Sequence, residues 1–322
     1  MTKRPVVLVT RKLPDSVEQR LGEHFETILN PDDKLYTGDE LLQLADKVDA
    51  ILPCHTEKFS AETIALLPPR IKAIANYSVG VDHVDLEAAK VKAIIVTNTP
   101  DVLSDATAEI AILLMLGAAR RASEGERTIR NQQWKDWSPA FMVGRQITNK
   151  RLGILGMGRV GQVVARRARG FDMEIHYHNR KPLDPGHEQG ATYHSTVEEL
   201  VSEIDVLSIN CPASENTRGL VNARLIAKMP AHAIIINTSR GVIVDDDALV
   251  DALKSGRIAA AGLDVFNGEP DTIHPQYRQL DNVFLLPHIG SATAEAREAM
   301  GFRAIDNLIA IFSGEEPGDR VA

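Results

Sequence analysis

The sequence predicts an α/β protein built from two doubly wound parallel-sheet domains. Three observations support this fold class. The chain has 322 residues, more than one hydrophobic core usually supports, and its 44% hydrophobic content is ample for two cores. Short β-branched runs alternate with helical patterns along most of the chain. One of these runs leads directly into a glycine-rich turn and a further helical pattern.

The first hundred residues contain five apolar runs that predict strands. Helical patterns separate these runs, and such alternation indicates parallel βαβ units. A helical pattern from Asp101 to Arg121 follows, and we expect it to link the two domains. The predicted strands run over Val6 to Thr10, Phe25 to Leu29, Ala50 to Pro53, Ile71 to Tyr77 and Ile94 to Asn98.

The same alternation continues after the glycine-rich turn, so the second domain is expected to be doubly wound as well. The last helical pattern, Ala292 to Phe312, follows the completed second sheet and is therefore expected to return to the first domain. This predicts a discontinuous first domain of residues 1–100 and 291–322 and a second domain of residues 101–290. The acidic residues after Ser313 are expected to fray. The predicted strands of the second domain are 173–178, 206–210, 233–237, 261–266 and 283–286.

The segment from Leu152 to Gly161 joins an apolar strand to a glycine turn and a helix. Gly156 permits the tight turn, Gly158 lets the backbone approach a pyrophosphate, and Gly161 lets the helix pack on its strand. The helical run Gln162 to Arg169 follows, and its free N–H groups and positive dipole end attract phosphates. Arg159 and Val160, within the turn, are also predicted cofactor contacts. We therefore predict a Rossmann-like dinucleotide site. A glycine-rich turn without a ligand is the alternative.

The residues after the next strand bear on the choice of dinucleotide. An NAD site usually places an acidic side chain there, on the ribose 2′-hydroxyl, but this chain reads Asn179-Arg180-Lys181. A carboxylate would repel a 2′-phosphate, whereas Asn179 is neutral and the two cations can bind a phosphate. The turn favours NADP(H), with NAD(H) still possible. A solvated surface turn is the alternative.

Composition argues against several classes of function. A net charge of −8 disfavours a nucleic-acid surface, because the phosphates would be repelled. The longest apolar run, Ile110 to Ala119, is too short to cross a bilayer. The amino terminus shows no apolar signal region, so a cytoplasmic location is expected. Only Cys54 and Cys211 occur, which fits a reducing compartment and provides no metal-binding set.

Three segments at the carboxyl ends of predicted strands contain Arg240, Glu269 and His288. Ligands bind at this edge of parallel sheets. Histidine titrates near neutral pH and can give a proton to a carbonyl oxygen that receives hydride at its carbon. A carboxylate beside the imidazole stabilises the protonated ring and orients it. An arginine can hold a substrate carboxylate and polarise the carbonyl. Taken alone, each is more often a surface residue, a salt bridge or a turn residue.

The order and residue sequence of these segments resemble the D-isomer-specific 2-hydroxyacid dehydrogenase family over essentially the whole chain. Within it, the sequence is most similar to glycerate dehydrogenases, that is, hydroxypyruvate and glyoxylate reductases. The resemblance implies NAD(P)H-dependent reduction of small 2-oxoacids to D-2-hydroxyacids, and the reverse oxidation, in a cleft between the domains. It assigns the same catalytic roles to Arg240, Glu269 and His288. It rests on residues 77–82, 106–109, 237–241, 264–270 and 286–291.

The resemblance also implies supporting residues. The backbone at Val79 and Gly80 matches a loop that binds the substrate carboxylate, and Asp264 matches a residue that binds the nicotinamide amide. Trp137 matches a tryptophan that reaches the active site of the neighbouring subunit, so residues 121–151 are predicted to form the dimerisation arm of a homodimer. Packing within the chain is the alternative for Trp137. Further implied cofactor contacts are Thr107, Cys211, Pro212, Thr217, Thr238, Ser239 and Gly290.

Related functions remain as alternatives. Formate dehydrogenases carry glutamine where this chain has Glu269, which disfavours formate as the substrate. Phosphite dehydrogenases carry lysine where it has Val79, which makes phosphite a weaker alternative. Phosphoglycerate dehydrogenases often add a regulatory domain for which 322 residues leave no room. Corepressors of the C-terminal-binding-protein type keep the fold and the catalytic residues but act as NAD(H)-binding scaffolds. The Asn179-Arg180-Lys181 turn and the lack of a long disordered tail disfavour that alternative.

Overall fold

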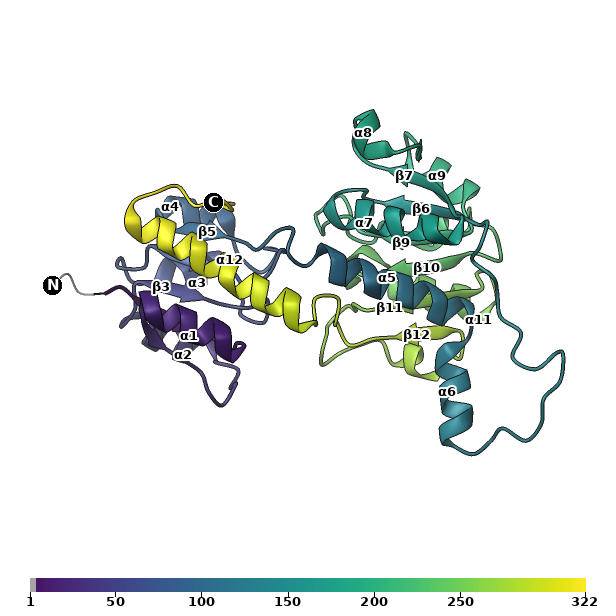
Figure 1. Cartoon of the computed structure of the whole chain (residues 1–322), viewed down its shortest axis with the longest axis horizontal. Coiled ribbons are helices and arrows are strands. Elements are labelled where there is room, and N and C mark those ends of the chain that lie inside the picture. The colour runs from purple at the N-terminus through teal and green to yellow at the C-terminus, as the bar shows by residue number, and fades with distance from the viewer. Residues whose placement is uncertain (1–3) are drawn as a thin grey trace. The chain divides into compact units, whose positions relative to one another are not determined.

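A computed structural model describes residues 4–322 of the chain (Figure 1). The chain divides into two compact units. The first unit comprises Met1–Leu103 and Ala292–Ala322, and the second comprises Ser104–Ser291. Each contains one parallel sheet with helices on both faces, so the predicted fold class is confirmed. In the described part of the chain, no helix is both long and apolar enough to cross a membrane.

The sheet of the first unit has five parallel strands in the order β2-β1-β3-β4-β5. Chain order reverses at β1, as in doubly wound sheets. The strands are shorter than the apolar runs that predict them, because the flanking residues belong to turns. Their bounds are β1 Val6–Val9, β2 Glu26–Ile28, β3 Ala50–Leu52, β4 Ala73–Ala75 and β5 Ile95–Thr97.

Successive side chains of β1 point to opposite faces of the sheet and so pack in two different cores. Val7 and Val9 join the core formed with α1 and α12, whereas Leu8 joins the core formed with α2, α3 and α4. The last helix therefore does cover the first sheet, where Ala304 and Leu308 are buried. The helices are α1 Asp15–His24, α2 Gly38–Ala45, α3 Ala61–Leu66, α4 Leu86–Val91 and α12 Ala294–Ser313.

The carboxyl-terminal residues are ordered against the sheet, so the expectation that they fray is wrong. Val96 donates to the carbonyl of Ala322 and accepts from Val321, and the N–H of Asn98 donates to Asp319. Arg303 binds the carboxylate of Asp319 through two nitrogens, each 2.8 Å from an oxygen. Charge composition alone suggested fraying, whereas this paired geometry holds the segment beside β5.

The sheet of the second unit has seven parallel strands in the order β12-β11-β10-β9-β6-β7-β8. Chain order reverses between β6 and β9, which is where ligands bind in open parallel sheets. Strand β8 is only two residues long and was not predicted. The bounds are β6 Arg151–Leu155, β7 Glu174–His178, β8 Thr192–Tyr193, β9 Val206–Ile209, β10 Ile234–Asn237, β11 Ala260–Leu263 and β12 Val283–Leu285.

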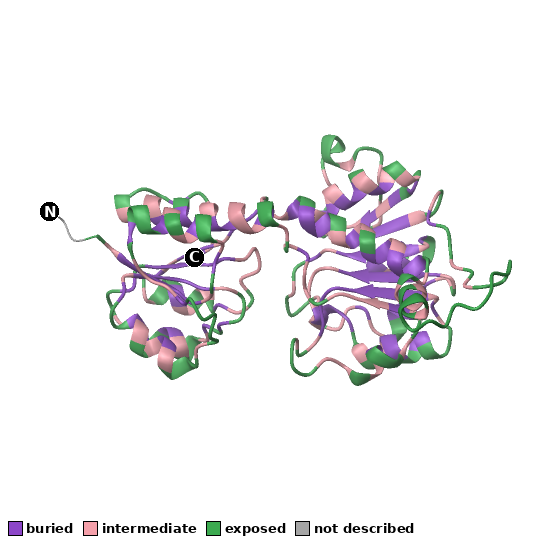
Figure 2. Cartoon of the chain, turned by 60° about the horizontal axis from the view of Figure 1, so that its bottom comes forward, coloured by how far each residue is buried: buried purple, intermediate pink, exposed green. Residues whose placement is uncertain are grey.

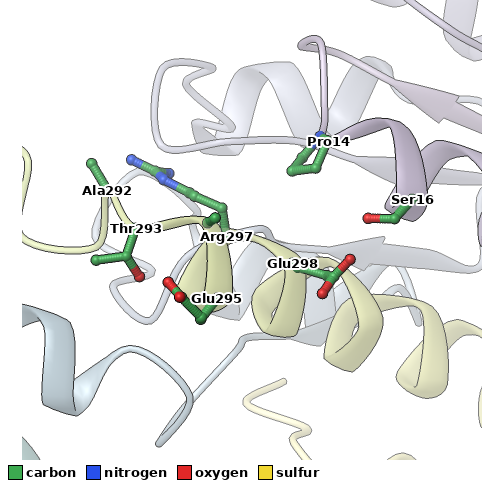
Figure 3. A pocket seen from close by; sticks show the side chains of 8 residues that line it. Pro14, Ser16, Ala292, Thr293, Glu295, Arg297 and Glu298 are labelled. Carbon is green, nitrogen blue, oxygen red and sulfur yellow. The ribbon is translucent and has the colours of Figure 1, made fainter.

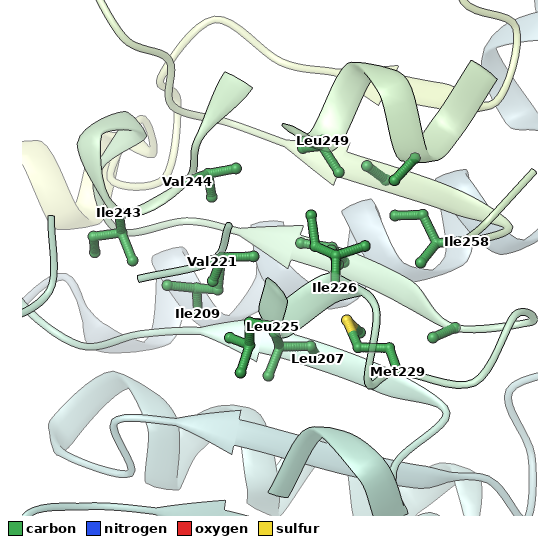
Figure 4. Packing of buried hydrophobic residues seen from close by; sticks show 14 of the residues in the cluster. Leu207, Ile209, Val221, Leu225, Ile226, Met229, Ile243, Val244, Leu249 and Ile258 are labelled. Carbon is green, nitrogen blue, oxygen red and sulfur yellow. The ribbon is translucent and has the colours of Figure 1, made fainter. Parts of the chain in front are cut away.

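Both faces of this sheet are buried, as the purple strands in Figure 2 show. Helices α5 and α7 cover one face, and α9, α10 and α11 cover the other, where Leu207, Ile226 and Leu249 pack together (Figure 4). The helices are α5 Ser104–Ala119, α6 Ala122–Arg130, α7 Arg159–Ala168, α8 Pro185–Glu188, α9 Val197–Glu203, α10 Ala223–Ile226 and α11 Asp246–Lys254; short 3₁₀ turns cover Arg169–Phe171, Gly241–Ile243 and Pro275–Gln279.

Candidate active site

The glycine turn after β6 requires glycine at two positions for steric reasons. Gly156 has φ +93°, and a Cβ there would lie 2.6 Å from backbone atoms of Cys211. A Cβ at Gly161 would lie 2.5 Å from the carbonyl oxygen of Gly156, so glycine lets α7 start against the turn. At Gly158 a Cβ would meet no atom within 4 Å, so protein packing does not require glycine there. Open space at this position fits a bound phosphate.

The amino end of α7 is chemically suited to an anion. No side chain caps the helix, and its first turn, which begins at Arg159 and Val160, contains no acidic residue. Uncapped N–H groups and the positive end of the helix dipole therefore remain for a ligand. The turn, the open face at Gly158 and this helix end together fit the pyrophosphate of a dinucleotide.

Asn179 lies at the end of β7 and contacts the glycine turn. Its Oδ1 accepts the N–H of Met157 at 2.7 Å, and its amide nitrogen lies 3.5 Å from the carbonyl oxygen of the same residue. The amide NH₂ has a second hydrogen that can face a ribose. Arg180 and Lys181 follow on the surface, and both are exposed. Neither forms a salt bridge with another described residue. These two cations are therefore available to a phosphate beside Asn179.

His288 and Glu269 form a direct pair. Nδ1 of His288 lies 2.6 Å from Oε1 of Glu269, and both side chains are about a quarter exposed, at 30% and 24%. The other carboxylate oxygen accepts the N–H of Phe266 at 2.7 Å, which fixes the orientation of Glu269. Nδ1 faces the carboxylate, so a proton exchanged between His288 and a substrate would pass through the other ring nitrogen, Nε2.

Arg240, Glu269 and His288 follow the carboxyl ends of β10, β11 and β12, which are neighbours in the sheet. Asn237, the last residue of β10, is almost fully buried and shapes the loop that carries Arg240. Its amide donates to the carbonyl of Arg240 at 3.0 Å, and its Oδ1 accepts the N–H of Ser239. This role of Asn237 was not predicted, because an asparagine at a strand end is also typical of an ordinary turn.

Asp264 is 1% exposed and holds the loop that follows His288. Its two carboxylate oxygens accept the N–H groups of Ile289 and Gly290, each at 2.8 Å. Burial raises the pKa of Asp264, although these two N–H donors act in the opposite direction. A Cβ at Gly290 would lie 3.2 Å from Asp264 and 3.4 Å from Thr107, so these three predicted residues are neighbours. Asp264 therefore positions the His288 loop, a role beyond the predicted contact with nicotinamide.

The other predicted cofactor contacts form a second group around Cys211. Ser239 Oγ donates to the carbonyl of Cys211, and Thr217 Oγ donates to the carbonyl of Pro212 at 2.9 Å. Thr238 Oγ lies 3.5 Å from Oδ1 of Asn210. Burial raises the pKa of the Cys211 thiol to about 11, so the thiol stays protonated at neutral pH. Cys211 therefore acts here through its packing against Gly156 and through its backbone carbonyl, and its protonated thiol is not a nucleophile.

In the first unit, Val79 and Gly80 lie in a half-exposed loop between β4 and α4. Among the residues that the structure describes, their backbone N–H groups donate to no acceptor. Two successive N–H groups without partners can donate to a bound anion. This agrees with the predicted carboxylate-binding role of the loop.

The predicted arm is part of the second unit. It consists of α6 and a long irregular segment, 131–150, which extends away from the sheet before Ile147 returns to the core (Figure 1). Trp137 is 71% exposed and Trp134 is 54% exposed, so neither is buried within this chain. Ile129 and Val143 are also exposed on the same segment. Several large apolar side chains are thus open to solvent along one stretch of the chain, and large exposed apolar side chains are common at interaction surfaces.

One open pocket lies elsewhere in the first unit, between the start of α1 and the first turn of α12 (Figure 3). It has a volume of about 580 Å³, and Ser16, Thr293, Arg297 and Glu298 contribute side chains to its wall. None of the residues predicted from the sequence lines it. Across residues 4–322, no group of three histidine, cysteine or acidic side chains is arranged to hold a metal ion.

Comparison with known proteins identifies the family. Residues 112–290 match the model of the D-isomer specific 2-hydroxyacid dehydrogenase NAD binding domain. The chain is 44% identical to glycerate dehydrogenase of Hyphomicrobium methylovorum over 98% of both chains. It is 42% identical to glyoxylate reductase of Thermococcus onnurineus, over 98% of this chain and 95% of the relative.

A solved structure is similar over the full length. It is an NADPH-dependent glyoxylate/hydroxypyruvate reductase from Sinorhizobium meliloti, in complex with NADP and malonate. It is 34% identical, with a TM-score of 0.88 over 99% of this chain and 97% of the other. The chain therefore belongs to the D-isomer specific 2-hydroxyacid dehydrogenase family, an oxidoreductase family, and the family resemblance noted from the sequence is confirmed.

Proposed function

We propose that this protein catalyses the NAD(P)H-dependent reduction of small 2-oxoacids, with glyoxylate and hydroxypyruvate as substrates and glycolate and D-glycerate as products, and the reverse oxidation. The pair formed by His288 and Glu269, 2.6 Å apart at the carboxyl ends of adjacent strands, carries this proposal. Relatives named glycerate dehydrogenase and glyoxylate reductase support the choice of substrates.

In this mechanism the nicotinamide cofactor, when bound, supplies the hydride to C2 of the substrate. His288 gives the proton on Nε2 to the carbonyl oxygen, while Glu269 stabilises the imidazolium before transfer. The guanidinium of Arg240 holds the substrate carboxylate and polarises the carbonyl, which lowers the cost of the developing alkoxide. In the first unit, the backbone N–H groups of Val79 and Gly80 offer a further group that can bind a carboxylate. In the oxidation direction His288 acts as the base.

We propose NADP(H) as the preferred cofactor, with NAD(H) also accepted. Asn179 presents no negative charge to a 2′-phosphate, and Arg180 and Lys181 are exposed beside it. The similar solved structure from Sinorhizobium meliloti holds NADP, which supports this choice. Gly156, Gly158 and Gly161 contribute the pyrophosphate turn.

The test is an assay of the purified protein with glyoxylate, hydroxypyruvate and larger 2-oxoacids, each with NADPH and with NADH, following oxidation of the cofactor. We expect turnover with glyoxylate and hydroxypyruvate, at kcat/KM values above those for bulkier 2-oxoacids. Binding of reduced cofactor without turnover of any 2-oxoacid would instead indicate a cofactor-binding scaffold. Faster turnover of phosphite or formate with the oxidised cofactor would contradict the substrate assignment.

A further inference from the structure

In the loop at residues 78–81 of the first unit, the backbone carbonyl groups and the backbone N–H groups differ in their hydrogen bonding. Its carbonyl groups are occupied: the carbonyl of Ser78 accepts the N–H of Thr99 at 3.1 Å, and that of Val81 accepts the N–H of Val84 at 3.0 Å. The N–H groups of Val79 and Gly80, in contrast, donate to no acceptor within residues 4–322. Every carbonyl of the loop is thus turned toward the protein, and two successive N–H groups are left for a ligand.

Two asparagine side chains bind the carbonyl groups of this loop. The amide nitrogen of Asn76 lies 2.9 Å from the carbonyl oxygen of Gly80 and 3.3 Å from that of Ser78. The amide nitrogen of Asn98 lies 2.9 Å from the carbonyl oxygen of Val79. Three consecutive carbonyls are therefore bound by only two side chains, which come from the ends of β4 and β5.

The side chain of Asn76 and the backbone of Asn98 are each held in place. Asn76 is fully buried, its Oδ1 lies 3.0 Å from Nε2 of His83, and its amide nitrogen faces the two carbonyls; exchanging the oxygen with the nitrogen would leave both carbonyls facing an acceptor. The backbone of Asn98 is fixed by its N–H bond to the carbonyl of Asp319. A peptide group is planar, so fixing its carbonyl also fixes the direction of the N–H on the other side.

We propose that Asn76 and Asn98 are positioning residues that aim the N–H groups of Val79 and Gly80 at the carboxylate of the substrate. This inference rests on the proposed function, because it takes a 2-oxoacid carboxylate as the anion bound by the loop. Neither side chain touches the substrate or gives it a proton. Each acts through a backbone carbonyl, and the fixed N–H pair lowers the conformational cost of binding the anion.

The experiment compares Asn76→Ala and Asn98→Ala with a matched control, Asn30→Ala. Asn30 is also a buried asparagine of the first unit, and its amide donates to two backbone carbonyls, those of Thr10 and Lys34, outside the loop. Oxamate serves as a carboxylate probe that is not reduced. The measurements are the oxamate dissociation constant in the presence of NADPH, the KM and kcat for glyoxylate, and the melting temperature.

We expect each loop variant to weaken oxamate binding and raise the KM for glyoxylate by about tenfold, the effect of losing one to two side-chain hydrogen bonds. The kcat and the KM for NADPH should change much less, because the loop binds the carboxylate equally in the ground and transition states. Asn30→Ala should lower the melting temperature without changing oxamate affinity. Asn98→Asp, which keeps the shape but removes the donor, should bind oxamate no better than Asn98→Ala.

Unchanged oxamate affinity in the Asn98 variants overturns the inference, and so does an equal loss of affinity in Asn30→Ala. Asn98 is only half-buried, so its variants keep the test valid even where Asn76→Ala fails to fold. Failure of the proposed function has a different signature, since the wild-type protein would then not reduce any 2-oxoacid.

Discussion

The carboxylate of Glu269 contacts two groups at once: one oxygen lies 2.6 Å from Nδ1 of His288 and the other accepts the N–H of Phe266 at 2.7 Å. Glu269→Gln keeps the size of the side chain but removes its charge, so the imidazolium loses its stabilising partner. We expect a fall in kcat for reduction of about 10- to 100-fold at neutral pH.

We expect this loss to appear in kcat, with the KM for NADPH almost unchanged, because Glu269 acts on the proton donor and not on cofactor binding. The measurements are kcat for glyoxylate and the KM for NADPH in both proteins. An unchanged kcat in the folded Glu269→Gln variant would show that Glu269 only shapes the loop.

Replacing His288 with alanine removes the proton donor. We expect a decrease in kcat of roughly 10²- to 10⁴-fold, with the KM for NADPH almost unchanged. The matched control is His274→Ala, because His274 forms a similar pair with Asp247 at 3.1 Å in the same unit and is not a predicted site residue. Near-normal turnover in folded His288→Ala would contradict the assignment.

The cofactor proposal predicts that Asn179→Asp combined with Arg180→Ala reverses the preference for NADPH. Aspartate still offers an oxygen to the N–H of Met157, which Asn179 accepts at 2.7 Å, so the glycine turn should stay intact. The removed cation and the added negative charge both act against a 2′-phosphate, by about 10- to 100-fold in relative kcat/KM.

The measurement for this pair is kcat/KM with NADPH and with NADH. Arg224→Ala, at an exposed arginine of the same unit, is the control and should leave the ratio unchanged. A wild-type protein that uses NADH more efficiently than NADPH would refute the proposal, and Arg180 and Lys181 would then be solvated surface charges.

Trp137 is 71% exposed in the single chain, so its loss should cost little monomer stability. If it reaches the active site of a neighbouring subunit, Trp137→Ala should change the relative kcat/KM among 2-oxoacids. The assay uses the same substrate panel, with the melting temperature as a check. Trp134→Ala is the control from the same segment. Identical substrate preferences in all three proteins would exclude this role for Trp137.

Helices α1 and α12 approach closely at Gly301. A Cβ there would lie 2.4 Å from Cγ1 of Val17, a fully buried β-branched side chain with little freedom to move. We expect Gly301→Ala to lower the free energy of unfolding by about 1–3 kcal/mol, because overpacking outweighs the gain in helix propensity. Chemical denaturation measures the change.

A control for that variant lies in α1. Gly22 is helical as well, and a Cβ there would meet nothing within 4 Å, so Gly22→Ala should stabilise the protein by about 0.5–1 kcal/mol. The double variant Gly301→Ala with Val17→Ala should be more stable than the sum of the single effects predicts. Simple additivity would mean that the two residues do not compete for the same space.

Most strands and both sheets were predictable because their apolar runs are continuous and buried on both faces. Strand β8 was not, since Thr192 and Tyr193 are too few to form a pattern. The catalytic residues were found through motifs at strand ends. The roles of Asn76 and Asn98 have no such signal in the sequence, because what an asparagine side chain binds depends on contacts that only the folded chain creates.

The pairing of residues 319–322 with β5 has a consequence for the behaviour of the protein at high concentration. An unpaired outer strand is a template on which a strand of another molecule can add, and such addition leads to aggregation. In this sheet the N–H and C=O groups of Val96 are already bonded to Val321 and Ala322. The other edge strand, β2, is short, and its exposed Glu26 places a charged side chain there that discourages pairing with another copy.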